Sequence, residues 1–436
     1  MTAPLALFLP CPGGVEDFLA DEVHGLTGLM GEDLLTVRGG VRVRGDWPLA
    51  LRLNLHSRLA QRVLVELAHA LYQDEHDLYR LAASVAWEDW FTPRQTFRVD
   101  ISAQASPLRS LNFATLRVKD AVADRFREHA GGVRPSIDTQ RPDARVTAHL
   151  SASHATLYID TSGEPLFKRG WRQDKGDAPL KETLAAAMLA ASGWWQPATR
   201  QVLPVPLYDP CCGSGTIVIE AAQLALGLPP GGQRRFAFER LRPFDSRQWG
   251  AIKKEASGAL LAGDIDQFDL KVESIQVFGS DVAHRMVDFA QRNAERAGVA
   301  QAVQLRGGDA LQRLPPADQP GILLMNPPYG ERIAAAGVAG RQGGGREAFQ
   351  SGTLARQRSD GAVTVQEVNA GDEFFTRLAA HWKSHYAGWT AWLLTPDLKL
   401  PGRLRLKESR RVPLWNGPIE CRLFRFDLTA RQPRST

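Results

Sequence analysis

Apolar residues in the first half of the chain recur at the spacings of alternating short strands and helices. Leu5–Pro10 predicts a strand, and Val15–Leu26 carries its apolar residues at helical spacing. Leu34–Val43 predicts a hairpin that turns at a pair of glycines, and Phe113–His129 predicts a longer helix. Further strands are expected at Phe97–Ala103, Arg145–Leu150 and Ala155–Thr161. This half of the chain therefore predicts an α+β arrangement in which a sheet packs on helices.

From Leu180 onward the pattern becomes the strand–helix alternation of a parallel α/β sheet. An Ala-rich helix is expected at Lys181–Ala191, and the continuous apolar run Gly321–Met325 predicts a strand buried on both faces. The other expected strands are Pro206–Asp209, Ser274–Gly279, Val303–Arg306, Trp389–Leu394 and Glu420–Leu428, and the other expected helices are Gly215–Ala225, Val282–Ala297 and Asp372–His385.

Three stretches lack this regular pattern. Thr161–Pro179 is rich in turn residues and contains the basic run Lys168–Arg172, which we expect to lie in a solvated linker. Pro229–Gly263 is basic and aromatic and stands where a short connection is expected. Ala334–Gly371 is rich in Gly, Arg, Gln and Ser and has no apolar periodicity, so a mobile loop is predicted over 334–371.

The composition is that of a soluble protein of two or three domains, with 436 residues, of which 44% are hydrophobic and 23% charged. The net charge of +5 is compatible with a polyanionic partner and equally with ordinary charge for solubility. The four cysteines include an adjacent pair and no CxxC spacing, which predicts reduced thiols and a cytoplasmic protein. The sequence contains no run of about 18 apolar residues, so no membrane span is predicted.

A glycine-rich turn follows the strand that ends at Asp209. The run Tyr208-Asp209-Pro210-Cys211-Cys212-Gly213-Ser214-Gly215 opens a helix, and its glycines allow a ligand to approach the backbone closely. Val218 occupies the third glycine position of the dinucleotide fingerprint, which argues against hydride chemistry. A carboxylate before the turn suits a cationic methionine group better than a phosphate. A nucleoside cofactor that carries such a group is therefore predicted.

Two more carboxylates follow at later strand ends. Asp281 is placed to accept hydrogen bonds from ribose hydroxyls, whereas Asp264 and Asp266 are nearer in sequence but follow no predicted strand. Asp309 could accept a hydrogen bond from an adenine amine. Any one of these residues alone could be a turn or helix-cap residue. Three such strand ends in chain order favour cofactor binding.

The fourth strand end carries Asn326-Pro327-Pro328-Tyr329. Methyl transfer to an aromatic amine requires a nitrogen lone pair that is freed from the ring. The Asn326 side-chain oxygen and the Pro327 carbonyl can each accept one amine hydrogen, and the two prolines hold that carbonyl in place. Tyr329 can stack on the base. These four residues are the predicted catalytic group.

Other chemistries find weaker support in the sequence. His381 and His385 are four residues apart but have no third ligand, so no metal site is predicted. Ser214 lacks the surroundings of a nucleophile elbow. A nucleophilic Cys211 or Cys212 stays open, although no histidine lies nearby in sequence.

Several motifs in order along nearly the whole chain resemble the THUMP-domain RNA methyltransferases, and among them the bacterial enzymes that form N2-methylguanosine in 23S ribosomal RNA. The motifs are Cys11–Glu16, Phe97–Ser106, Asn112–Ala114, Arg117–Phe126, Pro142–Val146, Asp160–Gly163, Lys168–Arg172, Ala178–Ala185, Asp209–Gly215, Asn326–Arg332 and Trp415–Arg422. The loop over 334–371 is longer than the family leads us to expect.

The resemblance implies a ferredoxin-like region over 1–55, a THUMP RNA-binding domain over 56–162, a linker over 163–179 and a Rossmann-like class I methyltransferase domain over 180–436. It implies S-adenosylmethionine as cofactor, with a methionine contact near Thr183. The predicted cofactor-binding residues are Thr183, Asp209, Pro210, Cys212, Gly213, Gly215, Asp281, Asp309 and Asn326. Some relatives carry a second methyltransferase domain, and that activity is expected to be absent from a chain that ends at Thr436.

The implied substrate is the N2 amine of a guanosine in 23S rRNA. Guanosine in tRNA is the alternative. DNA adenine and protein glutamine are less favoured as substrates, because the N-terminal half resembles a THUMP RNA-binding domain. A monomer is expected. Phosphate contacts are expected among Arg94, Arg98, Arg109, Arg117, Lys119, Arg125 and Arg127, each of which could also be a solvated surface charge. Base-stacking residues are expected in the segment Pro229–Trp249 and at Tyr329.

Overall fold

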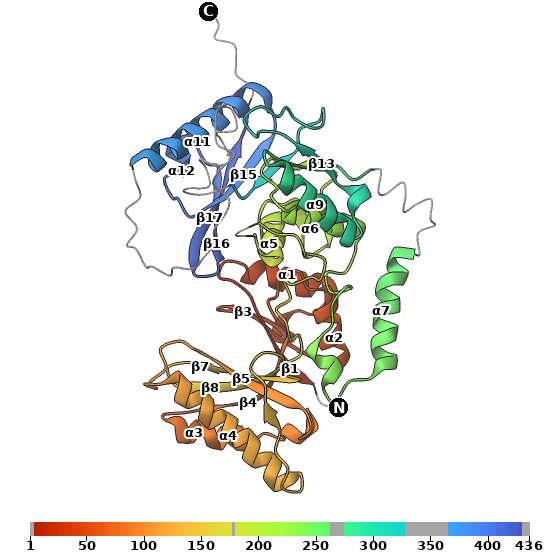
Figure 1. The fold of residues 1–436 in the computed structure, drawn as a ribbon, viewed down its shortest axis with the longest axis vertical. Helices are drawn as coiled ribbons and strands as arrows, with labels where there is room; N and C mark the ends of the chain where they lie inside the picture. The colour runs from red at the N-terminus through yellow and green to blue at the C-terminus, as the bar shows by residue number, and fades with distance from the viewer. Residues whose placement is uncertain (1–3, 177–178, 262–273, 328–364, 430–436) are drawn as a thin grey trace, which may run out of the picture.

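The computed structural model describes residues 4–176, 179–261, 274–327 and 365–429. The described residues form two large sheets, which lie one above the other along the long axis of the molecule (Figure 1), and one small two-stranded sheet. The N-terminal sheet lies at one end, and the C-terminal sheet with its helices lies at the other.

The N-terminal sheet has eight strands in the order β2-β3-β1-β4-β8-β7-β5-β6. Its strands are β1 (Leu5–Pro10), β2 (Leu34–Val37), β3 (Gly40–Gly45), β4 (Leu64–Leu71), β5 (Thr96–Ala103), β6 (Ser136–Ile137), β7 (Ala144–Leu150) and β8 (His154–Asp160). Its helices are α1 (Glu16–Thr27), α2 (Trp47–His56), α3 (Glu75–Ser84) and α4 (Leu111–His129). Because β1 pairs with β4, the two expected N-terminal regions share one continuous sheet.

The C-terminal sheet has seven strands in the order β13-β12-β11-β14-β15-β17-β16. They are β11 (Leu207–Asp209), β12 (Val277–Asp281), β13 (Gln304–Gly307), β14 (Ile322–Met325), β15 (Thr390–Thr395), β16 (Arg410–Asn416) and β17 (Ile419–Asp427). The first five run parallel, and β17 is antiparallel to both its neighbours. This is the predicted Rossmann-like α/β fold, in which the winding reverses between β11 and β14.

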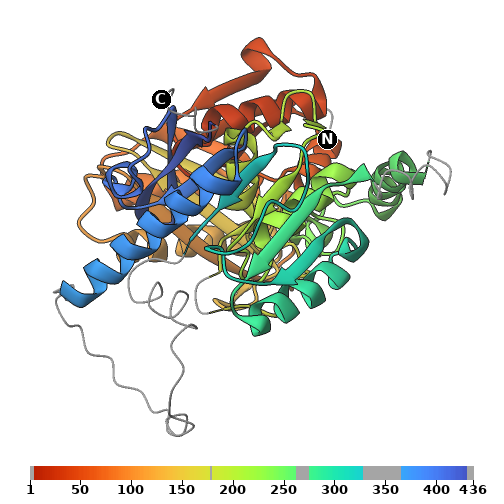
Figure 2. The ribbon, with the colours of Figure 1, turned by 90° about the horizontal axis from the view of Figure 1, so that it is seen from above.

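The helices of this half are α5 (Glu182–Ala191), α6 (Thr216–Leu226), α7 (Ser246–Leu261), α9 (His284–Arg296), α11 (Val365–His385) and α12 (Leu400–Leu404). A small hairpin of β9 (Trp195–Gln196) and β10 (Gln201–Val202) follows α5. Seen from above, helices flank both sides of the sheet (Figure 2). One buried cluster, which includes Phe375 and Trp382 of α11, covers one face.

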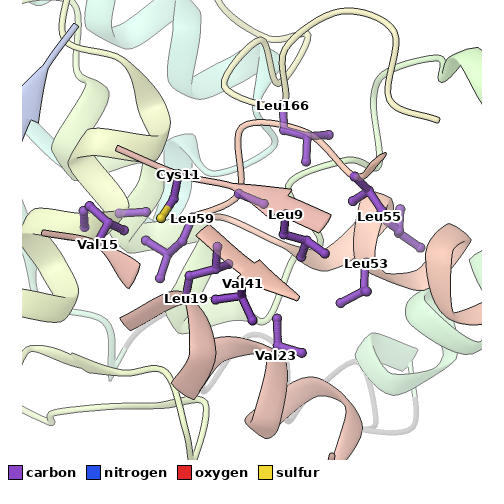
Figure 3. Packing of buried hydrophobic residues seen from close by; sticks show 14 of the residues in the cluster. Leu9, Cys11, Val15, Leu19, Val23, Val41, Leu53, Leu55, Leu59 and Leu166 are labelled. Atoms are coloured by element: carbon purple, nitrogen blue, oxygen red, sulfur yellow. The ribbon is translucent and has the colours of Figure 1, made fainter. Parts of the chain in front are cut away.

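All ten residues of α5 are buried, as expected for a helix that is apolar on every side. The helix lies between α1 and α6, and its side chains belong to a core that continues into the N-terminal half. Figure 3 shows the N-terminal part of that core, where Leu9, Val15 and Leu59 pack together. The two halves are therefore joined through a shared apolar interior.

Most of the elements expected from the periodicity are confirmed within one to three residues at each end. Three expectations about the irregular stretches are wrong. The segment Pro229–Gly263 contains α7, and Phe236, Phe238 and Trp249 are buried in contact with one another, so they cannot serve as base-stacking residues. Helix α11 begins at Val365, inside the range expected to be loop; residues 334–364 of that range lie outside the described residues.

The third wrong expectation is the solvated linker, because Arg169 and Trp171 are buried. The Arg169 guanidinium donates through Nε to Glu220 Oε1 at 2.9 Å, and Arg58 Nη1 donates to Glu220 Oε2 at 2.8 Å. Arg169 also donates to the carbonyl of Arg58 at 2.8 Å. Glu220 lies on α6, so this ion cluster joins the N-terminal half, the linker and the C-terminal sheet.

Candidate active site

Four predicted site residues lie at the carboxyl edge of the C-terminal sheet, and the strand register places them. Asp209 pairs with Gly279 of β12, so Asp281 stands two residues beyond it. Asp281 pairs with Gly307 of β13, and Asp309 follows in the same way. On the other side, Tyr208 pairs with Leu323, so Asn326 follows just past the level of Asp209. Asp209 and Asn326 thus flank the point where the winding reverses, the usual ligand site of such sheets.

The glycine turn is held against Asp281. The Gly213 N–H donates to Asp281 Oδ2 at 3.0 Å, and the Cys212 N–H donates to the carbonyl of Ser280 at 2.9 Å. Gly215, the residue before the first turn of α6, adopts φ +88°, and a Cβ there would lie 3.0 Å from the Cβ of Ala290. The space beside the Cα of Gly213 is open. The turn therefore forms a backbone cradle with room for a ligand.

Asp209 is the most strongly perturbed carboxyl group of this edge. It is 2% exposed, and one of its oxygens accepts the Cys211 N–H at 3.0 Å. Burial, opposed by this hydrogen bond and reinforced by the charge of Asp281, raises the pKa of Asp209 to about 8. A buried carboxyl group whose charge is poorly compensated favours a cationic ligand.

The other two carboxylates differ in their surroundings. Asp281 accepts the Ala283 N–H at 2.9 Å in addition to that of Gly213, and burial raises its pKa. Asp309 accepts the Leu311 N–H at 2.9 Å, which is the hydrogen bond of a turn residue. Pro210 is buried beneath the turn, where its carbonyl faces Ser280 Oγ at 3.5 Å.

The predicted catalytic tetrapeptide is described only in its first half. Asn326 and Pro327 follow directly after β14, with Asn326 half-buried and Pro327 buried. Pro328 and Tyr329 lie outside the described residues, as do Asp264 and Asp266. Thr183 lies in the first turn of α5 and is 2% exposed.

A residue that the sequence analysis missed holds the glycine turn from behind. Asn293 of α9 donates to the carbonyl of Ser214 at 3.0 Å and to that of Asp174 at 2.8 Å. Its fully buried side chain lies on the same helix stripe as Ala290 and Ala294. An asparagine within an otherwise apolar stripe was the signal that could have revealed this positioning role.

Several competing readings of the sequence lose support. Burial, reinforced by the charges of Asp209 and Asp281, raises the pKa of both Cys211 and Cys212 well above the ordinary range, so neither thiol ionises as a nucleophile must. No group of three potential metal ligands occurs among the residues that the structure describes. His381 instead contacts the carbonyl of Arg313 through Nε2 at 2.7 Å.

Most of the expected phosphate-binding residues of the N-terminal half already have a partner. Ion pairs join Arg98 to Asp100, Lys119 to Asp120, Arg125 to Glu88 and Arg127 to Asp124, and Arg117 lies over the ring of Tyr79. Within the described part of the chain, Arg94 and Arg109 have no such partner.

Three family models match successive parts of the chain. They describe the RlmL ferredoxin-like domain over residues 6–64, the THUMP domain over residues 72–160 and the RMKL-like methyltransferase domain over residues 169–341. The chain thus carries, in this order, stretches that match a ferredoxin-like domain, a THUMP domain and a methyltransferase domain. Among the described residues, no helix is long and apolar enough to cross a membrane.

Its relatives include proteins named Ribosomal RNA large subunit methyltransferase K/L. Those of Psychromonas ingrahamii and of a Shewanella species are 33% and 34% identical over 431 residues, which is 98% and 99% of this chain. The chain spans about half the length of these relatives, 51% and 54%.

Solved structures share the fold over the whole chain. SMU.472, solved in complex with SAH, superposes with a TM-score of 0.77 at 24% identity, and the match covers 100% of both chains. TrmN from Thermus thermophilus superposes with a TM-score of 0.62 at 19% identity, over 97% of this chain and 99% of that one. The arrangement of both halves is thus one that other proteins of known structure adopt.

Proposed function

We propose that this chain transfers a methyl group from S-adenosylmethionine to the exocyclic N2 amine of a guanosine in 23S ribosomal RNA. The observation that carries the proposal is the row of Asp209, Asp281 and Asn326 along one sheet edge, beside an open glycine cradle. The SAH bound to SMU.472 supports the methyl donor. The THUMP match supports an RNA substrate, and the names of the relatives support ribosomal RNA.

The chemistry of the described residues fits this cofactor. Asp209 would hold the methionine ammonium, Asp281 the ribose hydroxyls and Asp309 the adenine amine, while Gly213 and Gly215 let the cofactor lie against the backbone. Pro210, Cys212 and Thr183 would border the methionine part. When bound there, S-adenosylmethionine supplies an electrophilic methyl group. An RNA target supports a cytoplasmic location.

Asn326 and Pro327 would act on the nitrogen of the substrate. The Asn326 side-chain oxygen and the Pro327 carbonyl each accept one amine hydrogen, which draws the lone pair out of conjugation with the ring. Pro328 would fix that carbonyl through its restricted φ, and Tyr329 would stack on the base. The attacking amine is neutral, so its proton leaves only after the methyl group has been transferred.

Mass mapping of RNA tests the proposed substrate. In a strain that lacks the gene, one N2-methylguanosine should be missing from 23S rRNA, and the intact gene should restore it. A missing methyl group in tRNA beside fully modified 23S rRNA would overturn the choice of substrate. Methyl transfer from radiolabelled S-adenosylmethionine to purified protein or DNA, but not to RNA, would overturn the whole proposal.

The affinity for S-adenosylmethionine should rise with pH because of Asp209. Below its pKa of about 8 this carboxyl is mainly protonated, and a cationic ligand must displace that proton to bind. The affinity should therefore increase by up to about tenfold per pH unit between roughly pH 6 and 8, and then level off. Calorimetric titration of the wild-type protein at several pH values measures this slope.

The variant Asp209→Asn is the control for this pH dependence. It should bind more weakly, and the slope that remains should be only that of the ligand's own amine. Equal slopes in the two proteins would show that Asp209 does not contact the cation.

Asp281→Ala should weaken cofactor binding by about tenfold or more, because the variant loses both the ribose contact and the hydrogen bond that holds Gly213 in place. Asp288→Ala removes an exposed carboxylate on the neighbouring helix α9 and should leave the affinity unchanged. An affinity of Asp281→Ala equal to that of the wild type would exclude the ribose role.

A further inference from the structure

A cavity of about 440 Å³ lies at the seam between the two halves of the chain. Its wall combines the turn after β1, the tip of the β2–β3 hairpin, the start of α5 and the β16–β17 turn, and includes Gly13, Glu16, Arg38, Lys181, Thr183 and Trp415. None of these residues except Thr183 has a part in the proposed cofactor site.

The cavity lies beyond the carboxyl edge of the C-terminal sheet, the same edge that carries the candidate active site. Strand β17 pairs with β15 up to Arg422 opposite Thr395, and the hairpin continues past this pair to its turn beside Gly417. At roughly 3.4 Å per residue the turn extends about 10 Å beyond the carboxyl edge. Figure 1 shows this end of the hairpin next to α1. Thr183 lines this cavity and, in the proposed function, also borders the methionine part of the cofactor.

The glycines of the Cys11–Glu16 motif allow the hairpin to seat closely. A Cβ on Gly13 would lie 3.1 Å from the ring of Trp415. Gly14 adopts φ +81°, and a Cβ there would lie only 2.1 Å from the carbonyl oxygen of Pro413. The ring of Trp415 therefore packs against the backbone at Gly13. The half-buried ring also forms part of the cavity wall.

The charges around the cavity favour an anion. Lys181 and Arg38 are its two cations, and neither forms an ion pair within the described part of the chain. Lys181 Nζ lies over the ring of Phe167, 5.3 Å from its centroid. Two helices, α1 and α5, begin at the cavity, and neither start is capped by a side chain. The acid Glu16 accepts the Gly14 N–H at 2.6 Å and the Gly39 N–H at 3.1 Å, and so fixes the hairpin tip that carries Arg38.

Thr183 supplies an independent indication of a ligand. Its side chain is 2% exposed and lines the cavity, yet its hydroxyl has no hydrogen-bond partner among the described atoms. A polar group of a ligand inside the cavity could therefore form a hydrogen bond with this hydroxyl.

We propose that the seam cavity binds the RNA strand next to the nucleotide that is methylated. A phosphodiester group lies between Lys181 and Arg38 at the two helix starts, and the adjoining unpaired base lies against Trp415. The inference rests on the proposed function, since it assumes an RNA substrate at the neighbouring site. It assigns to the joint between the two halves a direct part in holding the substrate.

The probe for this site is a fluorescein-labelled single-stranded RNA of about 16 nucleotides, titrated with the full-length protein at several salt concentrations. Lys181→Gln and Arg38→Gln should each weaken binding about fivefold or more. Each should also lower the slope of log affinity against log salt by about 0.7, the value for one phosphate contact on a single strand. Trp415→Leu should weaken binding at least about fivefold without changing the slope.

Conservative variants and a surface control keep the result interpretable. Lys181→Arg keeps the positive charge and Trp415→Phe keeps an aromatic ring, so both variants should bind RNA nearly as well as the wild type. If either side chain had only a structural role, RNA affinity and salt slope would not follow the retained charge and the retained ring in this way. Lys254→Gln removes an exposed cation on α7, a helix that contributes no residue to the cavity wall, and should change nothing.

The cofactor affinity separates this inference from the proposed function. Wild-type affinity for S-adenosylmethionine together with an unchanged RNA salt slope in Lys181→Gln and Arg38→Gln would overturn the seam site alone. A wild-type protein that binds neither S-adenosylmethionine nor RNA would overturn both.

Discussion

Replacing Asn326 with alanine is expected to lower the rate of methyl transfer by at least about a hundredfold. The side-chain oxygen is proposed to accept a hydrogen of the reacting amine, and this contact strengthens as the nitrogen loses its conjugation. The affinity for S-adenosylmethionine should stay within about tenfold of the wild type, because most of the cofactor contacts come from other strand ends. Single-turnover kinetics and calorimetry measure the two quantities separately.

The variant Asn326→Asp provides the comparison for this result. It keeps an acceptor oxygen in the same place, so it should retain more activity than the alanine variant. Turnover of Asn326→Ala equal to that of the wild type would remove this residue from the mechanism, whereas equal losses of turnover and cofactor affinity would assign it to cofactor binding instead.

Replacing Glu220 with glutamine is expected to destabilise the protein by about 3–5 kcal/mol. The Glu220 side chain is fully buried between Arg58 and Arg169, whose side chains are 5% and 1% exposed. Burial on its own raises the pKa of Glu220, but the two guanidinium groups outweigh it and lower the pKa below its ordinary value. Without the carboxylate, two buried cations lose their common counter-charge. The midpoint of urea unfolding, followed by tryptophan fluorescence, measures the loss.

An exposed ion pair supplies the matched control. Arg52 and Glu255 lie 3.2 Å apart with side chains that are 51% and 69% exposed. Glu255→Gln should therefore cost less than about 0.5 kcal/mol. Losses of similar size in the two variants would mean that the buried cluster contributes no more to stability than a surface pair.

The regular elements of the fold could be predicted because their signals are local. The apolar run Gly321–Met325 and the periodic helix at Phe113–His129 reflect burial patterns within one segment, and the structure has a strand and a helix there. Helix α7 was missed because its segment is flanked by turn residues and carries aromatic groups that resembled a binding surface. The aromatic side chains were in fact core residues, a distinction that composition cannot make.

The buried basic run shows why the other part could not be predicted. Arg169 sits in a stretch with the composition of a solvated linker, and its counter-charge Glu220 lies 51 residues further along the chain. A charge is buried only where the fold brings a partner to it. The role of Asn293 was hidden for the same reason, since the turn it supports is 79 residues away.

The sequence by itself determined that carboxylates, a glycine turn and Asn326 stand at successive strand ends of a parallel sheet. Parallel strands place their carboxyl ends on one edge, so this order was enough to predict one site. Only the tertiary structure decided that the two N-terminal regions share a sheet, that Arg58, Arg169 and Glu220 meet in the interior, and that a charged cavity forms where Trp415 meets Gly13. These features depend on contacts between distant segments, whose free energies are set by burial and by the partner rather than by local pattern.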